Sequence, residues 1–182
     1  MEVPVLFLDR DGVLIEDTGY PSSKSEIQWI SGAFEALRTL KRRGFRLIVV
    51  TNQSAVARGY MSFQDLIEIQ GHINDRFERE GCGFEAIYVA PTHPDGEIWP
   101  WNRPSTWRKP GSGMLEAAIR DYGVDRQRAA LVGDSLRDIE AGRAARLGFV
   151  IQYGEQEFAS VEADFQTSKW SEISRILSDK EW

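Results

Sequence analysis

The sequence predicts an α/β fold with three layers around a central parallel sheet. Short apolar runs typical of buried strands alternate along the chain with longer segments in which apolar residues recur every three or four positions, as on one face of a helix. Alternation of this kind is typical of parallel sheets with right-handed crossovers. The chain has 182 residues, 42% of them hydrophobic, which is enough for one sizeable core. We therefore expect a single domain over residues 1–182.

The first half of the chain follows these patterns closely. Val5 to Leu8 are continuously apolar, as in a strand buried on both faces. The next helical segment has Leu37 and Leu40 on one face and Gly44 at its end, where glycine commonly terminates a helix. The predicted elements are a strand at 4–8, a polar segment with glycines at 10–26, a helix at 31–43, a strand at 45–50 and a helix at 62–80.

The second half continues the alternation around one long loop. Its predicted elements are a strand at 85–89, a loop rich in Pro and Trp at 91–109, a helix at 112–122, a strand at 128–132, a helix at 135–146, a strand at 148–152 and, in the tail, a short strand and a helix over 170–179. The segments after Asp11 and after strand 85–89 are too short for a large second domain. We therefore expect that they form, at most, a minimal cap over one end of the sheet.

Composition narrows the class of protein. The net charge of −6 argues against a nucleic-acid-binding face. No apolar run approaches the ~20 residues that span a bilayer, and the first strand starts without a signal-like segment before it. The single cysteine, Cys82, rules out an internal disulfide framework and suits a reducing compartment. We therefore expect a cytoplasmic monomer that binds neither membrane nor nucleic acid.

The segment from Leu6 to Val13 is the most informative in the chain. An apolar run ends in two carboxylates, Asp9 and Asp11, and Gly12 follows at once. Open α/β sheets bind ligands at the carboxyl ends of their strands. A carboxylate there can act as a nucleophile if a cation offsets its charge, and a second one nearby can act as general acid or base. Alone, the pattern also fits a strand followed by an ordinary Asp-Gly turn.

Polar residues follow other predicted strands in the same way. The second strand leads into Thr51–Ser54, whose hydroxyl and amide groups can hold phosphate oxygens. Lys109 precedes a predicted helix, where a fixed ammonium can neutralise a phosphate. Asp134 follows the strand at 128–132. Taken singly, Thr51 also fits an ordinary strand residue and Lys109 a solvated surface charge.

In this order the motifs resemble the haloacid-dehalogenase-like (HAD) phosphohydrolases, in the branch that includes heptose bisphosphate and histidinol-phosphate phosphatases. The resemblance covers about residues 3–151. It rests on Asp9–Val13, Asp17–Tyr20, Thr51–Ser54, Ala57–Tyr60, Arg108–Pro110 and Gly133–Ser135. It implies the Rossmann-like form of the three-layer fold with a minimal cap.

The resemblance also implies catalytic roles. Asp9 is expected to be the nucleophile that becomes an aspartyl-phosphate, and Asp11 the acid that protonates the leaving oxygen and later the base that activates water. Thr51 is expected to hydrogen-bond the transferring phosphoryl group, and Lys109 to neutralise its charge. These four residues and Asp134 are all present, which argues against a non-catalytic binding protein on the same fold.

The expected metal is Mg²⁺, which prefers oxygen ligands and usually binds one or two carboxylates together with substrate phosphate. The implied ligands are Asp9, the backbone carbonyl of Asp11, and Asp134. Asp138 is open between two roles. It lies three residues after Ser135, as in a capping box, and in some relatives an acidic residue here supports the metal through water.

The loop at 91–109 departs from the pattern of the branch, many of whose members carry a structural zinc there, bound by three cysteines and a histidine. The corresponding positions are Ala90, Thr92, Ser105 and Trp107, none of which is a normal zinc ligand, and His93 stands alone. We therefore expect no zinc. The loop is expected to be ordered by its prolines and by burial of its tryptophans, with sugar stacking as the other reading of the tryptophans. These residues are Trp99, Trp101, Trp107, Pro94, Pro100 and Pro104.

The substrate is expected to be a small phosphorylated metabolite. Two arginines, Arg58 and Arg108, could pair with a second phosphate of the substrate. This favours D-glycero-D-manno-heptose 1,7-bisphosphate, hydrolysed at position 7. The alternatives are histidinol phosphate, whose amine Glu16 or Asp17 could meet, and a polynucleotide 3′-phosphate, which the acidic composition disfavours. The expected substrate contacts are Asp17, Tyr20, Asn52, Gln53, Ser54, Arg58 and Arg108.

Overall fold

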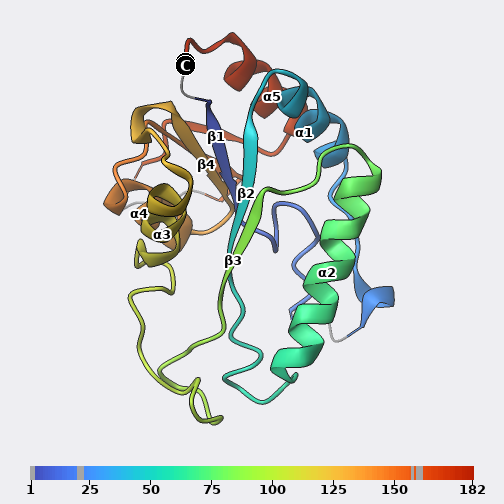
Figure 1. Ribbon diagram of the computed structural model, residues 1–182, viewed down its shortest axis with the longest axis vertical. Coiled ribbons are helices and arrows are strands. Elements are labelled where there is room, and N and C mark those ends of the chain that lie inside the picture. The colour runs from blue at the N-terminus through green and yellow to red at the C-terminus, as the bar shows by residue number, and fades with distance from the viewer. Residues whose placement is uncertain (1–2, 20–22, 157, 159–161) are drawn as a thin grey trace.

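A six-stranded sheet in the order β3-β2-β1-β4-β5-β6 runs through the centre of the computed structural model (Figure 1). Every neighbouring pair of strands is parallel. The structure describes residues 3–19, 23–156, 158 and 162–182. The strands are β1 (Val5–Leu8), β2 (Arg46–Asn52), β3 (Ala86–Ala90), β4 (Ala129–Gly133), β5 (Phe149–Tyr153) and β6 (Phe165–Thr167).

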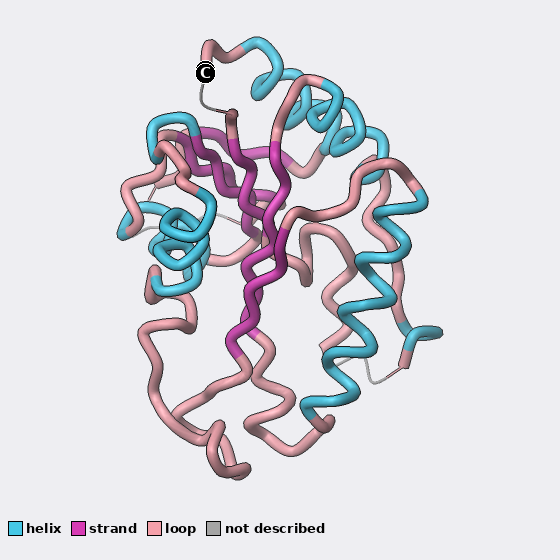
Figure 2. Tube along the Cα trace, in the orientation of Figure 1, coloured by secondary structure: helices cyan, strands magenta, loops and turns pink. Residues whose placement is uncertain are grey.

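Helices cover both faces of the sheet and make the three predicted layers (Figures 1 and 2). The helices are α1 (Ala33–Arg42), α2 (Phe63–Arg79), α3 (Gly113–Tyr122), α4 (Leu136–Ala144) and α5 (Trp170–Asp179). Leu6 and Leu8 of β1 belong to the core shared with α1, α2 and α5. Val5 and Phe7 belong to the core shared with α3 and α4. Because side chains alternate along a strand, one continuous apolar run supplies both cores.

The observed elements match the predicted ones to within about two residues at each end. The strand predicted at 45–50 continues to Asn52, because Thr51 and Asn52 pair with Val89 and Ala90 of β3. The polar segment at 10–26 contains a short 3-10 helix, Lys24–Glu26. Tyr20 lies outside the described residues, so its predicted substrate contact has no structural counterpart here.

The topology brings the predicted chemical groups to one edge of the sheet. β1 lies between β2 and β4, and the backbone N–H of Asp9 donates to the carbonyl of Val132 at 2.9 Å. The carboxyl ends of these three parallel strands therefore meet, and the residues that follow them converge. None of the helices in the described part of the chain is both long and apolar enough to cross a membrane.

Candidate active site

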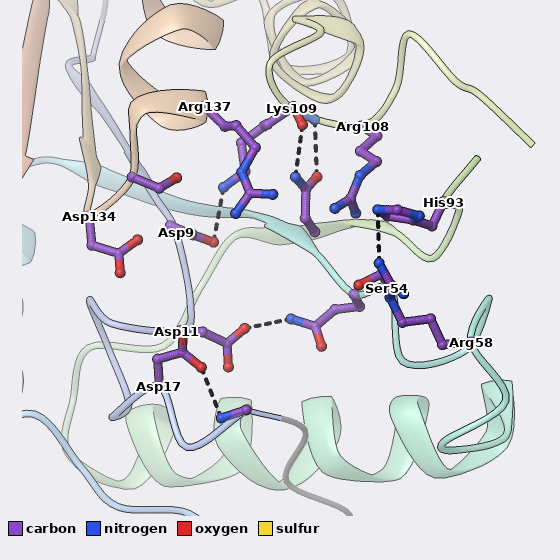
Figure 3. Close-up of a pocket in the computed structure, with 14 residues that line it drawn as sticks. Asp9, Asp11, Asp17, Ser54, Arg58, His93, Arg108, Lys109, Asp134 and Arg137 are labelled. Atoms are coloured by element: carbon purple, nitrogen blue, oxygen red, sulfur yellow. Dashed lines mark hydrogen bonds and ion pairs between the residues drawn. The ribbon is translucent and has the colours of Figure 1, made fainter. Parts of the chain in front are cut away.

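A cavity of about 360 Å³ opens at this edge of the sheet (Figure 3). Carboxylates line its inner part, among them Asp9, Asp11 and Asp134, and Lys109 lies beside them. Of the other predicted residues that the structure describes, Asp17, Asn52, Gln53, Ser54, Arg58 and Arg108 also line it. Thr51 is buried just beneath, where its hydroxyl accepts from Gln53 at 2.9 Å.

Lys109 is the electrostatic centre of the inner part. Its ammonium is 2% exposed and lies 2.9 Å from Asp9 Oδ1 and 2.5 Å from Asp138 Oδ1. It also donates to the carbonyl of Val50 at 2.8 Å. Burial pulls the pKa of Lys109 down, but Asp138 and Asp9 outweigh burial and hold the pKa above its usual value. Lys109 therefore carries a permanent positive charge against Asp9.

Asp138 has a dual role that the sequence left open. Its Oδ2 accepts from the backbone N–H of Ser135 at 3.1 Å and from the Ser135 hydroxyl, which caps the start of α4. Its Oδ1 pairs with Lys109. The capping interpretation is thus confirmed, and Asp138 is in addition the second carboxylate partner of the buried lysine.

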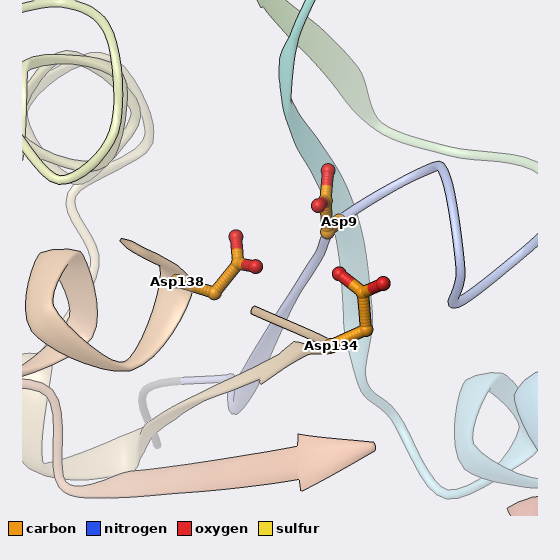
Figure 4. A group of neighbouring side chains, drawn as sticks. All are labelled: Asp9, Asp134 and Asp138. Carbon is orange, nitrogen blue, oxygen red and sulfur yellow. The ribbon is translucent and has the colours of Figure 1, made fainter. Parts of the chain in front are cut away.

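Asp9, Asp134 and Asp138 form a cluster that fits a divalent cation (Figure 4). One carboxylate oxygen from each lies within 4.8 Å of the others. Two glycines allow this crowding: a Cβ on Gly12 would fall 2.0 Å from Asp134 Oδ2, and one on Gly133 would fall 2.1 Å from the Cβ of Asp138. An all-oxygen donor set of carboxylates suits Mg²⁺.

The carboxylates of this cluster repel one another. Burial and then Asp138 raise the pKa of Asp9 to about 7, although Lys109 opposes the change. Burial and then Asp138 likewise raise the pKa of Asp134 to about 6. A raised carboxyl pKa means that negative charge is poorly compensated in the site. A bound dication would supply the missing compensation.

The carboxylate of Asp11 is held by Arg10 and Gln53 and not by Lys109. Both of its oxygens accept from Arg10, whose Nη2 lies 2.9 Å from Oδ1. Gln53 donates to Asp11 Oδ2 at 2.6 Å (Figure 3). The sequence identified Asp11 and Gln53 but gave no role to Arg10, which is 1% exposed.

Asn52 fixes the backbone of Lys109. Its Nδ2 donates to the Lys109 carbonyl at 2.9 Å, and its Oδ1 accepts from the Lys109 N–H at 3.0 Å. The side chain was predicted to contact substrate. It does line the cavity, but both ends of its amide are engaged in holding Lys109, so we expect its contribution to be mainly one of position.

Basic side chains gather in the outer part of the cavity, on the side away from Asp9 and Asp134 (Figure 3). Arg58, His93 and Arg108 lie together there, whereas Arg137, which also lines the cavity, lies nearer Lys109 and Asp9 (Figure 3). Arg58 Nη2 lies 3.2 Å from His93 Nε2, and Arg108 donates to the carbonyl of Thr92 at 3.4 Å. Partial burial and the charges of Arg108 and Arg58 lower the pKa of His93. The sequence identified Arg58 and Arg108; His93 and Arg137 were missed because only the folded chain brings them to the cavity.

The loop at 91–109 is ordered largely as expected. Three of the four positions that correspond to zinc ligands, Thr92, Ser105 and Trp107, line one cavity of about 390 Å³. The Trp107 indole donates to the carbonyl of Val89 at 2.9 Å, and Trp101 stacks on Phe63 with ring centroids 5.1 Å apart. Trp101 and Trp107 are thus half-buried and packed against neighbouring residues, as expected in part.

The expectation was wrong for the third tryptophan of the loop, Trp99. This side chain is 83% exposed and cannot order the loop by burial.

Comparisons with known proteins point to one family. The model of the haloacid dehalogenase-like hydrolase family matches residues 8–146. The D-glycero-alpha-D-manno-heptose-1,7-bisphosphate 7-phosphatase of Burkholderia mallei is 36% identical over 161 residues, which cover 88% of this chain and 85% of that protein. The D-glycero-beta-D-manno-heptose-1,7-bisphosphate 7-phosphatase of Escherichia coli is 40% identical over 151 residues, which cover 80% and 76%.

A solved structure is similar over nearly the whole chain. It is the D,D-heptose 1.7-bisphosphate phosphatase from B. bronchiseptica, complexed with magnesium and phosphate. Its TM-score is 0.81 at 25% sequence identity, with 97% of this chain and 98% of that chain covered.

Proposed function

The chain belongs to the haloacid dehalogenase-like hydrolases and is a phosphatase, and on this premise we propose that it removes the 7-phosphate from D-glycero-D-manno-heptose 1,7-bisphosphate. The observation that carries this substrate is the division of the cavity into two parts of opposite charge. Carboxylates and Lys109 gather in the inner part, whereas Arg58 and Arg108 lie together on the opposite side of the cavity, which is its outer part (Figure 3). With a divalent cation held by the carboxylates, each part would bind one phosphate of a bisphosphate.

Asp9 is proposed as the nucleophile. Lys109 and the backbone N–H of Arg10, 2.7 Å away, both contact Oδ1, so Oδ2 is the oxygen for attack. Oδ2 bonds to phosphorus as the bond to the sugar oxygen breaks, and that oxygen takes a proton from Asp11. Water then attacks phosphorus, gives a proton to Asp11, and releases phosphate and free Asp9.

Mg²⁺ is the proposed cofactor. Asp9, Asp134 and the backbone carbonyl of Asp11 would hold it, with Asp138 close by. When bound, it supplies positive charge beside the phosphoryl group, where charge develops during transfer. Lys109 adds positive charge from the protein side, and Thr51 would hydrogen-bond the phosphoryl group. We propose that zinc has no part, because the four loop positions lack thiolates and imidazoles.

Phosphate release from a panel of esters tests the proposal. The panel contains the α and β anomers of the heptose bisphosphate, the corresponding 1-phosphate, histidinol phosphate, a 3′-phosphorylated oligonucleotide and p-nitrophenyl phosphate. We expect kcat/KM to be highest for one bisphosphate anomer. A preference for histidinol phosphate would overturn the substrate, since its amine would then be tolerated beside the arginines of the outer part.

The same proposal places the enzyme in the cytoplasm as a monomeric single domain. Sugar phosphates are intracellular metabolites, and Cys82 is a buried free thiol. Sedimentation of the purified protein measures its state of association directly.

A further inference from the structure

Arg10 is the most unusual charged residue outside the roles already assigned. It lies between Asp9 and Asp11 in the sequence, yet only 2% of its side chain is exposed. A buried ion pair is seldom more stable than an apolar replacement of similar size, because both charges lose their water. Stability alone therefore does not account for an arginine at this position.

The guanidinium of Arg10 is fixed by three side chains. Its Nε lies 3.1 and 3.2 Å from the two Asp11 oxygens, and its Nη2 lies 2.9 Å from Oδ1. Nη2 also donates to Gln53 Oε1 at 2.7 Å, and Nη1 to Gln70 Oε1 of α2 at 3.4 Å. The direction of the guanidinium fork is thus set before substrate arrives.

Gln53 closes the network. While its Oε1 accepts from Arg10, its Nε2 donates to Asp11 Oδ2 at 2.6 Å and to Thr51 Oγ1 at 2.9 Å. Asp11 therefore receives donors from two side chains, each of which also orients the other. A carboxylate whose side chain is 20% exposed could otherwise adopt several rotamers.

We propose that Arg10, together with Gln53, is a positioning residue that fixes the carboxyl group of Asp11 for proton transfer. The inference rests on the proposed role of Asp11 as general acid and base. Arg10 serves only as a hydrogen-bond donor, because a guanidinium has no acceptor atom. The proton passes from Asp11 to the leaving oxygen, and the positive guanidinium of Arg10 stabilises the carboxylate that forms on Asp11.

The expected consequence depends on the leaving group. An alkyl phosphate needs a proton on its departing oxygen, whereas p-nitrophenolate departs without one. General acid catalysis contributes about 10²–10⁴-fold, and misplacement by about 1 Å can cost about 10²-fold. Arg10→Met should therefore lower kcat/KM for the best alkyl phosphate of the panel by about 10²-fold and for p-nitrophenyl phosphate by less than about threefold. Arg10→Lys, which keeps one charge but loses the fork, should lie between.

A double-variant cycle separates positioning from a general structural effect. Asp11→Asn removes the proton donor, so adding Arg10→Met to it should cause no further loss on the alkyl phosphate. Additive losses, or equal losses on both esters, would overturn the inference. Arg38→Met is the matched control. Arg38 does not line the cavity, and its guanidinium forms a similar pair with Glu80, at a distance of 2.8 Å. This variant should leave kcat/KM for both esters unchanged.

The design separates this inference from the proposed function. If wild-type enzyme hydrolyses another alkyl phosphate but neither heptose bisphosphate, the substrate is wrong and Arg10 is tested on that ester. If wild-type enzyme hydrolyses no ester, both proposals fall. Should the Arg10 variants not fold, Gln53→Met removes the other donor to Asp11 and must give the same dependence on the leaving group.

Discussion

Asp9→Asn should abolish turnover and at the same time stabilise the metal-free protein. Turnover is lost because an amide cannot form the aspartyl-phosphate. Stability rises because burial and Asp138 raise the pKa of Asp9 to about 7, from 3.8. A carboxyl whose pKa is raised on folding stabilises the fold fully only below its unfolded pKa, and this contribution is lost as the pH rises through the folded pKa.

The size of the gain in stability follows from the difference between the folded and unfolded pKa of Asp9. At pH 8 wild-type Asp9 is ionised in both the folded and the unfolded protein. The pKa differs between these states by about three units, and at about 1.4 kcal/mol per unit the gain in unfolding free energy for Asp9→Asn has an upper limit of roughly 4 kcal/mol. At pH 5.5 Asp9 is protonated when folded and ionised when unfolded, so the gain falls to about 2 kcal/mol.

Urea denaturation of both proteins in EDTA, at pH 8 and pH 5.5, measures the gain. Asp75→Asn is the matched control, because Asp75 is exposed on α2, and it should change stability by less than about 0.5 kcal/mol. The reasoning is refuted if metal-free Asp9→Asn is no more stable than wild type at pH 8. Wild-type turnover in the pure variant would refute the role of Asp9 as nucleophile.

Three further outcomes are expected. Asn52→Ala should lower kcat by about tenfold with little change in KM, since it releases the backbone of Lys109 and loses hydrogen bonds worth about 1–2 kcal/mol; steady-state kinetics would contradict this if only KM changed. Arg108→Ala should lower kcat/KM for the bisphosphate by about 10–100-fold and leave p-nitrophenyl phosphate nearly unaffected, as removal of a charge-assisted hydrogen bond predicts; equal losses would place Arg108 at the phosphoryl group. EDTA should abolish activity and Mg²⁺ restore it, and elemental analysis should find no zinc; stoichiometric zinc that resists dialysis would mean that the ligand positions in loop 91–109 were misassigned.

The fold was predictable because its signals are local. Apolar runs such as Val5 to Leu8 and helical stripes such as that of α1 are set by the period of each element. The convergence of the main candidate site residues was also predictable, because Asp9, Thr51 and Asp134 lie at or near strand ends that a parallel sheet must bring together. The end of β2 was not, since its last residues depend on pairing with β3.

The rest of the site depends on contacts between distant parts of the chain. Arg10 beside two aspartates has the appearance of a solvated charge, and only its contacts with Gln53 and Gln70, 43 and 60 residues away, reveal a buried one. Asn52 reads as a phosphate contact until its bonds to Lys109, 57 residues away, are seen. No local period or propensity encodes such pairs.

The two ends of the loop between β3 and α3 are anchored by consecutive residues of one strand end. Gln53 N–H donates to the carbonyl of Ala90, where the loop begins, and the Asn52 side chain holds Lys109, where it ends. The loop is therefore an interchangeable module: its length and sequence can change between fixed anchor points without moving the lysine. Natural drift or deliberate grafting could in this way alter which metabolite is accepted, or dispense with a structural metal, while the hydrolytic machinery is inherited intact.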